Sequence, residues 1–317
     1  MYKEQTVAVI IPAYNEEKLI GQVIDTMPEF VDCIIVVDDK SIDGTVQVVK
    51  RYIQNIPSRR IECIEHTHNA GTGAARISGL KRACQESFDL VAMMDGDGQM
   101  DPSELIRLLD PIANGKTDVV KGNRLFSGEA WKIIPKSRYL GNSVLSLLTK
   151  MASGYWHIAD SQSGYFAISG QILKLLSLET LYTNYGFPND FLIHLNIIDA
   201  RVRDVPIRPI YHIGEQSNLK ISSAIPRISY LLLRRFLWRM KEKYVIRDFH
   251  PLVFFYFMSF LLFLIDIPLA VRALLIAIET SRWPPINFLT VVFLTSTAIQ
   301  FLLFAMWFDM DRNKHLK

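Results

Sequence analysis

Residues 90–99 read LVAMMDGDGQ, and this stretch decides the fold. The five apolar residues 90–94 have the length of a buried β-strand, and Asp95 and Asp97 follow directly at its end. Hard divalent cations such as Mg²⁺ or Mn²⁺ prefer oxygen ligands and commonly share their coordination with substrate phosphates. The stretch therefore predicts a metal site at a strand end, with a polar turn after a core strand as the alternative.

Apolar runs alternate with helical patterns through the first 120 residues or so. The predicted strands are residues 6–11, 33–37, 61–65, 90–94 and 119–120, each separated from the next by a predicted helix. Strands that are apolar throughout and alternate with helices are typical of a mostly parallel sheet covered on both faces. In such α/β sheets ligands bind outside the carboxyl ends of the strands.

The predicted strands end in polar residues that should meet at this edge of the sheet. They are Pro12, Tyr14, Asn15 and Glu16 after the first strand, Asp38 and Asp39 after the second, Asn69 and Gly71 after the third, and Asp95 and Asp97 after the fourth. Four polar strand ends at one crevice are more specific than a single Asp-x-Asp motif. The pattern therefore favours a binding site over an isolated turn.

Three of these segments resemble the inverting family 2 glycosyltransferases, which have the GT-A nucleotide-sugar fold. The segments are residues 11–17 (IPAYNEE), 37–45 (VDDKSIDGT) and 95–99 (DGDGQ), and the resemblance covers roughly residues 6–211. The chain is most similar to the dolichol-phosphate mannose synthase-like group, which transfers a sugar from a nucleotide to a polyprenyl phosphate. The resemblance implies a UDP- or GDP-sugar donor, a polyprenyl phosphate acceptor, and Mg²⁺ or Mn²⁺ held by Asp95 and Asp97.

The resemblance also implies a nucleotide-sugar site. Its expected residues are Pro12, Tyr14, Glu16, Asp39, Asn69, Gly71, Asp95 and Gln99. Asp39 would contact the base or ribose, Asp97 would be the direct metal ligand, and Asp95 would hold either the metal or sugar hydroxyls. The glycine-rich turn at residues 69–73 would let backbone approach the nucleotide, although a tight turn that caps a helix explains the same glycines.

Three further residues are candidates for the chemistry. Arg124 follows the fifth strand and is expected to contact phosphate, with a solvated surface arginine as the alternative. A phosphate acceptor is already anionic and needs no general base, whereas a hydroxyl acceptor does. By the resemblance, Asp160 would orient the acceptor or metal, and Asp190 falls where the wider family often keeps its base. Asp190 is equally compatible with a helix cap.

The acceptor phosphate has three candidate ligands. Arg201 and Arg203 alternate in an extended segment expected after the sheet, and Lys220 precedes a basic helix. Arginine on an exposed strand face is the alternative interpretation.

The composition changes near residue 251. Residues 251–271 and 286–308 are almost wholly apolar, and each reaches the roughly 20 residues that a helix needs to cross a bilayer. We therefore expect a catalytic domain over residues 1–228, a basic amphipathic interfacial helix over 229–250, and an anchor of two transmembrane helices over 251–317.

The flanking charges predict the orientation of these spans. Lys and Arg are concentrated before the first span and after the second, which places the catalytic domain and both termini in the cytoplasm. The mixed basic and apolar residues 229–250 suit a helix on an anionic leaflet, or one packed on its own domain. Asp266 lies within the first span, where we expect a helix–helix or headgroup contact.

The remaining bulk properties exclude little. The formal net charge of +3 gives no argument for nucleic-acid binding. Three cysteines without metal or redox spacing fit a reducing compartment, and a homo-oligomer through the spans is possible.

The sequence gives less support to three alternative functions. A processive polysaccharide synthase would carry Gln-x-x-Arg-Trp in its catalytic domain, whereas the nearest match here, at Glu279, Arg282 and Trp283, falls on the predicted outer loop. The others are transfer to another glycolipid or polysaccharide acceptor, and a non-catalytic membrane scaffold that kept the fold.

Overall fold

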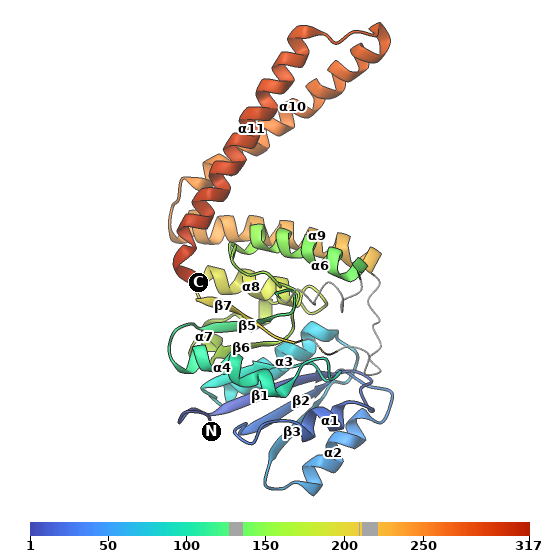
Figure 1. The fold of residues 1–317 in the computed structure, drawn as a ribbon, viewed down its shortest axis with the longest axis vertical. Coiled ribbons are helices and arrows are strands. Elements are labelled where there is room, and N and C mark those ends of the chain that lie inside the picture. The colour runs from blue at the N-terminus through green and yellow to red at the C-terminus, as the bar shows by residue number, and fades with distance from the viewer. Residues whose placement is uncertain (127–135, 209, 211–220) are drawn as a thin grey trace. The chain divides into compact units, whose positions relative to one another are not determined.

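The computed structural model describes residues 1–126, 136–208, 210 and 221–317 (Figure 1). The chain forms two compact units. Unit 1 comprises Met1–Phe236 and His315–Lys317, and unit 2 comprises Leu237–Lys314.

A seven-stranded sheet in the order β3-β2-β1-β4-β6-β5-β7 forms the centre of unit 1 (Figure 1). The strands are β1 (Val7–Ala13), β2 (Cys33–Asp38), β3 (Arg60–Glu65), β4 (Leu90–Met93), β5 (Val119–Asn123), β6 (Phe166–Ser169) and β7 (Val202–Pro206). Among the described strands β6 alone is antiparallel, inserted between β4 and β5. The carboxyl ends of the parallel strands therefore lie at one edge.

Helices cover both faces of this sheet. They are α1 (Ile20–Asp25), α2 (Thr45–Asn55), α3 (Thr72–Gln85), α4 (Leu105–Ala113), α7 (Gly170–Leu175) and α8 (Phe187–Ile197). Two further helices are α6 (Lys136–Ser153), which packs against α8, and α9 (Ile221–Lys241). Alternate residues of β1 enter opposite apolar cores: Ile10 packs in the core that includes α3 and α8, and Ile11 packs in the core that includes α1 and α4. Burial on both faces explains why β1, β2 and β4 are almost wholly apolar, whereas the edge strands β3 and β7 carry charged residues.

The mostly parallel α/β fold and the five predicted strands are confirmed. Two strands were not predicted. Residues 201–209 were expected to follow the sheet, but Val202–Pro206 pairs in parallel with β5 as an edge strand. The four residues of β6 are too few to show a period of their own, so only their pairing with β4 and β5 identifies them.

Unit 2 contains a hairpin of two long helices, α10 (Leu252–Thr280) and α11 (Pro285–Arg312) (Figure 1). Both are long and apolar enough to cross a membrane, and most of each apolar window is exposed, unlike a core helix of a soluble domain. They contain nearly all of the predicted spans and extend beyond them. Ser259 Oγ donates to Ala298 O at 2.9 Å, and Asp266 accepts from Thr295 Oγ1, so Asp266 makes a helix–helix contact.

A buried polar cluster joins the last turn of α9 to the last turn of α11 within unit 2. Arg239 and Asp309 are both fully buried and pair through Nη2 and Oδ2 at 2.9 Å. Tyr244, in a one-turn π-helix (Glu242–Arg247), donates to Asp309 Oδ1 at 2.6 Å. Asn313 donates to the Tyr244 hydroxyl at 2.8 Å. This cluster fixes the entry of the chain into the hairpin.

Candidate active site

The loops after β1 and β2 are tied together by hydrogen bonds. Asn15, whose φ of 59° is left-handed, accepts from Ile42 N at 2.9 Å through its side chain. Glu16 N donates to Thr45 Oγ1 at 2.8 Å. Glu17 Oε2 accepts from Gly44 N at 3.0 Å. The predicted segments 11–17 and 37–45 therefore form one wall at the carboxyl edge of the sheet.

Asp39 supports the turn that follows β3. Its Oδ1 accepts from Ala70 N and its Oδ2 accepts from Gly71 N, both at 2.8 Å, and His66 Nδ1 lies 2.8 Å from Oδ1. The side chain is buried, and both oxygens are engaged by the protein. Asp39 therefore shapes the turn, and its expected contact with a base or ribose stays a prediction.

The neighbouring Asp38 was not among the predicted site residues. Its Oδ2 accepts from Ser41 N at 3.0 Å. Its Oδ1 is buried and has no hydrogen-bond partner among the residues that the structure describes. A buried acceptor without a donor is rare, so Asp38 has unused capacity that Asp39 lacks.

The glycines of the turn at residues 69–73 are required by the close packing of another segment of the chain. Gly71 has a φ of +98°, which favours glycine. A Cβ on Gly73 would lie 2.5 Å from Thr183 C and from Tyr182 O. Close approach of residues 182–184, rather than of a ligand alone, therefore requires glycine here, and sequence spacing could not show that contact.

The other predicted nucleotide-site residues surround the same edge. Pro12 is buried near the end of β1, and its carbonyl accepts from Gly96 N at 3.2 Å. Tyr14 and Asn69 are exposed on their loops. Gln99 N donates to Asp97 Oδ1 at 3.0 Å.

Asp95 pairs with an arginine that sequence reasoning missed. Arg76 Nη2 lies 2.6 Å from Asp95 Oδ1, and its Nη1 donates to Thr72 Oγ1 at 2.7 Å. Arg76 is buried, in the second turn of the helix that the glycine-rich turn opens. The only sequence signal is the i, i+4 spacing of Thr72 and Arg76, which puts both on one helix face. A Cβ on Gly164 would lie 2.9 Å from Asp95 Oδ2, so the loop at residues 160–164 also reaches this carboxylate.

The site carries an excess of negative charge. Burial, and then the charges of Asp97 and Asp95, raise the pKa of Glu16 to about 7. No group of three His, Cys, Asp or Glu side chains within the described ranges is arranged to hold a metal by itself. Mg²⁺ typically binds through one or two carboxylates, water and substrate phosphates. Asp95 and Asp97 therefore fit a divalent cation whose remaining ligands come with a diphosphate.

Arg124 and Asp160 form a bidentate pair. Arg124 Nε lies 2.8 Å from Asp160 Oδ2, and its Nη2 lies 3.1 Å from Oδ1. Burial opposes the charged form of Asp160, but the attraction of Arg124 outweighs it and the pKa of Asp160 is lowered. Asp160 is therefore an ionised partner that orients Arg124, and Arg124 is not a freely solvated surface side chain.

Lys121 was also missed by sequence reasoning. It is fully buried in β5, and its Nζ donates to Ser163 O at 2.8 Å. Burial lowers the pKa of Lys121 to about 8, against the attraction of Asp160 and Asp204. Lys121 thus holds the loop that carries Asp160 and Gly164. Its place in an apolar strand gave no local signal of this role.

Asp190 lies in a buried ion pair, and burial raises the pKa of its carboxyl group. It is fully buried in the first turn of α8, with Oδ1 2.7 Å from Arg235 Nε. Its Oδ2 accepts from Tyr182 N at 2.8 Å. The carboxylate therefore binds α9 and the segment before α8. It is not the cap of its own helix that the alternative interpretation suggested.

Arg201 lies at the opposite edge of the sheet. Its Nη2 is 2.8 Å from Asp118 Oδ1, before the first residues of β5 and β7. That edge is separated from Asn123 by roughly 16 Å at the usual strand rise. Arg201 is thus not in position to hold a phosphate beside Asp95.

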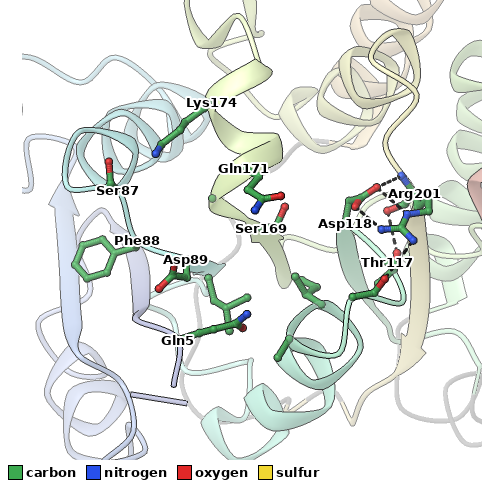
Figure 2. Close-up of a pocket in the computed structure, with 15 residues that line it drawn as sticks. Gln5, Ser87, Phe88, Asp89, Thr117, Asp118, Ser169, Gln171, Lys174 and Arg201 are labelled. Atoms are coloured by element: carbon green, nitrogen blue, oxygen red, sulfur yellow. Dashed lines mark hydrogen bonds and ion pairs between the residues drawn. The ribbon is translucent and has the colours of Figure 1, made fainter. Parts of the chain in front are cut away.

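A pocket of about 270 Å³ lies at this opposite edge (Figure 2). Lys174 and Arg201 line it together with Asp89 and Asp118, so its cations are matched by carboxylates. Of the other predicted acceptor ligands, Arg203 is exposed on β7 and Lys220 lies outside the described residues.

Comparison with known proteins identifies similar chains. The profile of glycosyl transferase family 2 matches residues 8–176. The UDP-N-acetylglucosamine–dolichyl-phosphate N-acetylglucosaminyltransferase of Methanococcus voltae is 33% identical over 66% of this chain and 87% of its own length. The undecaprenyl-phosphate mannosyltransferase of Micrococcus luteus is 31% identical over 63% of this chain and 82% of its own.

Solved structures share the fold. Glucosyl-3-phosphoglycerate synthase from Mycobacterium tuberculosis, crystallised with Mn²⁺, UDP and phosphoglyceric acid, superposes with a TM-score of 0.53. The match covers 74% of this chain and 78% of that chain at 20% identity. At that identity the likeness establishes the architecture alone.

Proposed function

This chain belongs to glycosyl transferase family 2, and we propose on that premise that it transfers one sugar from a UDP- or GDP-sugar to a polyprenyl phosphate. The acceptor would be a dolichyl or undecaprenyl phosphate, as the names of the relatives from Methanococcus voltae and Micrococcus luteus suggest. In this reaction an acceptor phosphate oxygen attacks the anomeric carbon as the bond to the nucleoside diphosphate breaks, which inverts the anomeric centre.

The donor half of the proposal rests on the carboxylates after β4. The departing nucleoside diphosphate gains negative charge, and a bound Mg²⁺ or Mn²⁺ would neutralise it. Asp95 and Asp97 would hold that cation, and their negative charges, which together with burial raise the pKa of Glu16 to about 7, favour its binding. Arg124, oriented by Asp160, would contact a phosphate.

The nucleotide itself would lie against the loops at this edge of the sheet. Glu16 and Gly71 would line it, with Asp39 acting through the turn that it supports. The proposed contacts also include Pro12, Tyr14, Asn69, Asp95 and Gln99.

The observation that carries the choice of acceptor is the pairing of the candidate bases. A hydroxyl acceptor requires a general base near its proton. Asp160 is paired with Arg124 and Asp190 with Arg235, so each carboxylate already has a cation of the protein as its partner. A phosphate needs no such base, and this supports polyprenyl phosphate over a sugar hydroxyl.

The membrane helices support a lipid acceptor as well. α10 and α11 would span the bilayer, with the catalytic unit and both termini in the cytoplasm according to the charge bias. The exposed residues of α9 alternate apolar Leu233 and Leu237 with basic Arg234 and Lys241, a mixture suited to an anionic leaflet.

A transfer assay with a panel of donors tests the proposal. The purified, detergent-solubilised chain is mixed with polyprenyl phosphate, Mn²⁺ or Mg²⁺, and individual UDP- and GDP-sugars, and lipid products are identified by mass spectrometry. One sugar on the lipid phosphate, lost on chelation, is the expected result. Donor binding without a lipid product would favour another glycolipid or polysaccharide acceptor, and no donor binding at all would favour a non-catalytic scaffold.

A further inference from the structure

An ion pair joins α8 to α9 within unit 1. Arg235 Nε lies 2.7 Å from Asp190 Oδ1, and its Nη2 lies 3.2 Å from Oδ2. His194 Nδ1 is 3.5 Å from the same carboxylate, but burial lowers the pKa of His194, so its ring is neutral at physiological pH. Arg235 is therefore the cation that balances Asp190.

The same groups anchor residues 180–186, which we call the bridging segment. Arg235 Nη2 donates to Thr180 O at 2.6 Å, and Tyr182 N donates to Asp190 Oδ2 at 2.8 Å. A Cβ on Gly186 would lie 2.5 Å from Leu231 Cδ2 of α9. Both ends of the bridging segment are therefore fixed by α8 and α9.

The middle of the bridging segment lies on the glycine-rich turn. Thr183 O accepts from Ala74 N at 2.9 Å, and Gly73 approaches Thr183 so closely that no side chain fits between them. The other side of the turn is held by Asp39 through Ala70 and Gly71. The turn is thus clamped between Asp39 and the bridging segment.

A second set of contacts links the start of α8 to the candidate metal ligand Asp95. The Arg76 guanidinium lies 5.9 Å from the centre of the Phe187 ring, at the start of α8. Phe187 stacks on Phe191 with ring centroids 5.5 Å apart. Arg76 in turn pairs with Asp95 at 2.6 Å. The start of α8 therefore contacts both the turn and the partner of a candidate metal ligand.

We propose that Asp190 and Arg235 are positioning residues for the sugar donor. Their ion pair holds the bridging segment and the start of α8 in place, so that the turn and Asp95 are ordered for the nucleotide diphosphate and its metal only when α9 is seated. This inference rests on the proposed function and adds regulation to it: donor affinity depends on how α9 is seated on α8 and the bridging segment. Asp190 thereby acts on the donor through the protein and touches no reacting atom.

The test compares Arg235→Gln with the control Arg107→Gln, which removes the exposed partner of the buried Glu104 at the start of α4. Binding of UDP and GDP with Mn²⁺ is measured by titration calorimetry on the full chain in detergent. Coupled sites typically change affinity by about 5- to 150-fold, and we expect the Kd and donor KM of Arg235→Gln to rise about tenfold. We expect its kcat to be within about twofold of wild type, because the chemistry itself is untouched. The control should bind as wild type does.

Hydrogen exchange distinguishes a positioning role of Arg235 from a purely local one, because a local role would leave exchange in the glycine-rich turn unchanged. The amides of residues 70–76 should exchange faster in Arg235→Gln, with or without nucleotide. Gly73→Ala pushes the bridging segment off the turn without altering the ion pair. It should raise the nucleotide Kd in the same direction even if Arg235→Gln fails to fold.

Several outcomes would overturn the inference. The inference is overturned if Arg235→Gln and Gly73→Ala both bind nucleotide with wild-type affinity and both show wild-type hydrogen exchange. An Asp190→Asn enzyme with unchanged donor KM and a kcat reduced by orders of magnitude would also overturn it, because that result makes Asp190 a base. Failure of the proposed function gives a different result, since the wild-type chain itself would then bind neither UDP nor GDP.

Discussion

Replacing Asp160 with Asn should reduce turnover by a predictable amount. Asp160 accepts two charge-assisted hydrogen bonds from the Arg124 side chain, at 2.8 and 3.1 Å. Hydrogen bonds to charged groups contribute about 1.5–3 kcal/mol and neutral ones about 0.5–1.5 kcal/mol. Loss of the charge should therefore weaken the hold on Arg124 by roughly 2 kcal/mol over the two bonds. That energy corresponds to a decrease of roughly 30-fold in kcat/KM.

The assay is steady-state transfer to polyprenyl phosphate over a range of pH, with Asp118→Asn as the matched control. Asp118 forms a similar pair with Arg201 at the opposite edge of the sheet, so its loss should leave kcat/KM unchanged. The pH profile should keep its shape, since Asp160 is already ionised.

Two results would refute this reasoning. General bases contribute about 10²- to 10⁴-fold. A loss near the top of that range, with the acidic limb of the pH profile removed, would make Asp160 a base instead of the partner of Arg124. A loss no greater than that of Asp118→Asn would mean that the pair does not position Arg124 for the reaction.

Three further predictions concern the metal site, pH and the hairpin. Asp97→Asn should abolish Mn²⁺-dependent UDP or GDP binding in calorimetry without lowering the melting temperature; retained metal dependence would contradict the assignment of Asp97. The pKa of Glu16 is raised to about 7, so the metal-free folded state holds a proton that the unfolded state releases at lower pH. Its stability should therefore fall as pH rises from about 4.5 to 7, and thermal unfolding of Glu16→Gln should lack that part of the slope. Asp309→Ala leaves Arg239 buried without its carboxylate and should lower the free energy of unfolding by about 3–5 kcal/mol, as measured by denaturation in detergent; a change under about 1 kcal/mol would mean that water reaches the pair.

Local pattern was sufficient for the framework of the fold. β1, β2 and β4 are apolar over several residues, and the first four strands are each followed by polar groups, so their number, their parallel arrangement and their common edge followed from the sequence. The same reasoning brought together Glu16, Asp95 and Asp97, because the carboxyl ends of neighbouring parallel strands must be close. Sequence reasoning failed for β6, because its four residues are identified as a strand only by their pairing with β4 and β5.

Contacts between distant segments could not be read from the sequence. Asp39 supports a turn about 31 residues later in the chain. Asp190 pairs with Arg235, 45 residues away, and Arg201 with Asp118, 83 residues away. Lys121 and Arg76 were missed because a buried cation is recognised by the carboxylates and carbonyls that three-dimensional packing brings to it.

The central claim is that the acceptor is a lipid phosphate, and one comparison tests it most directly. Transfer is measured with a polyprenyl phosphate and with the matching polyprenol, at equal concentration in the same detergent, with the donor that the panel identifies. The account predicts a sugar–phosphate–lipid product with the phosphate and none with the alcohol, because Asp160 and Asp190 each already have a cation of the protein as partner. Comparable transfer to polyprenol, or transfer to neither lipid in the presence of a bound donor, would contradict it.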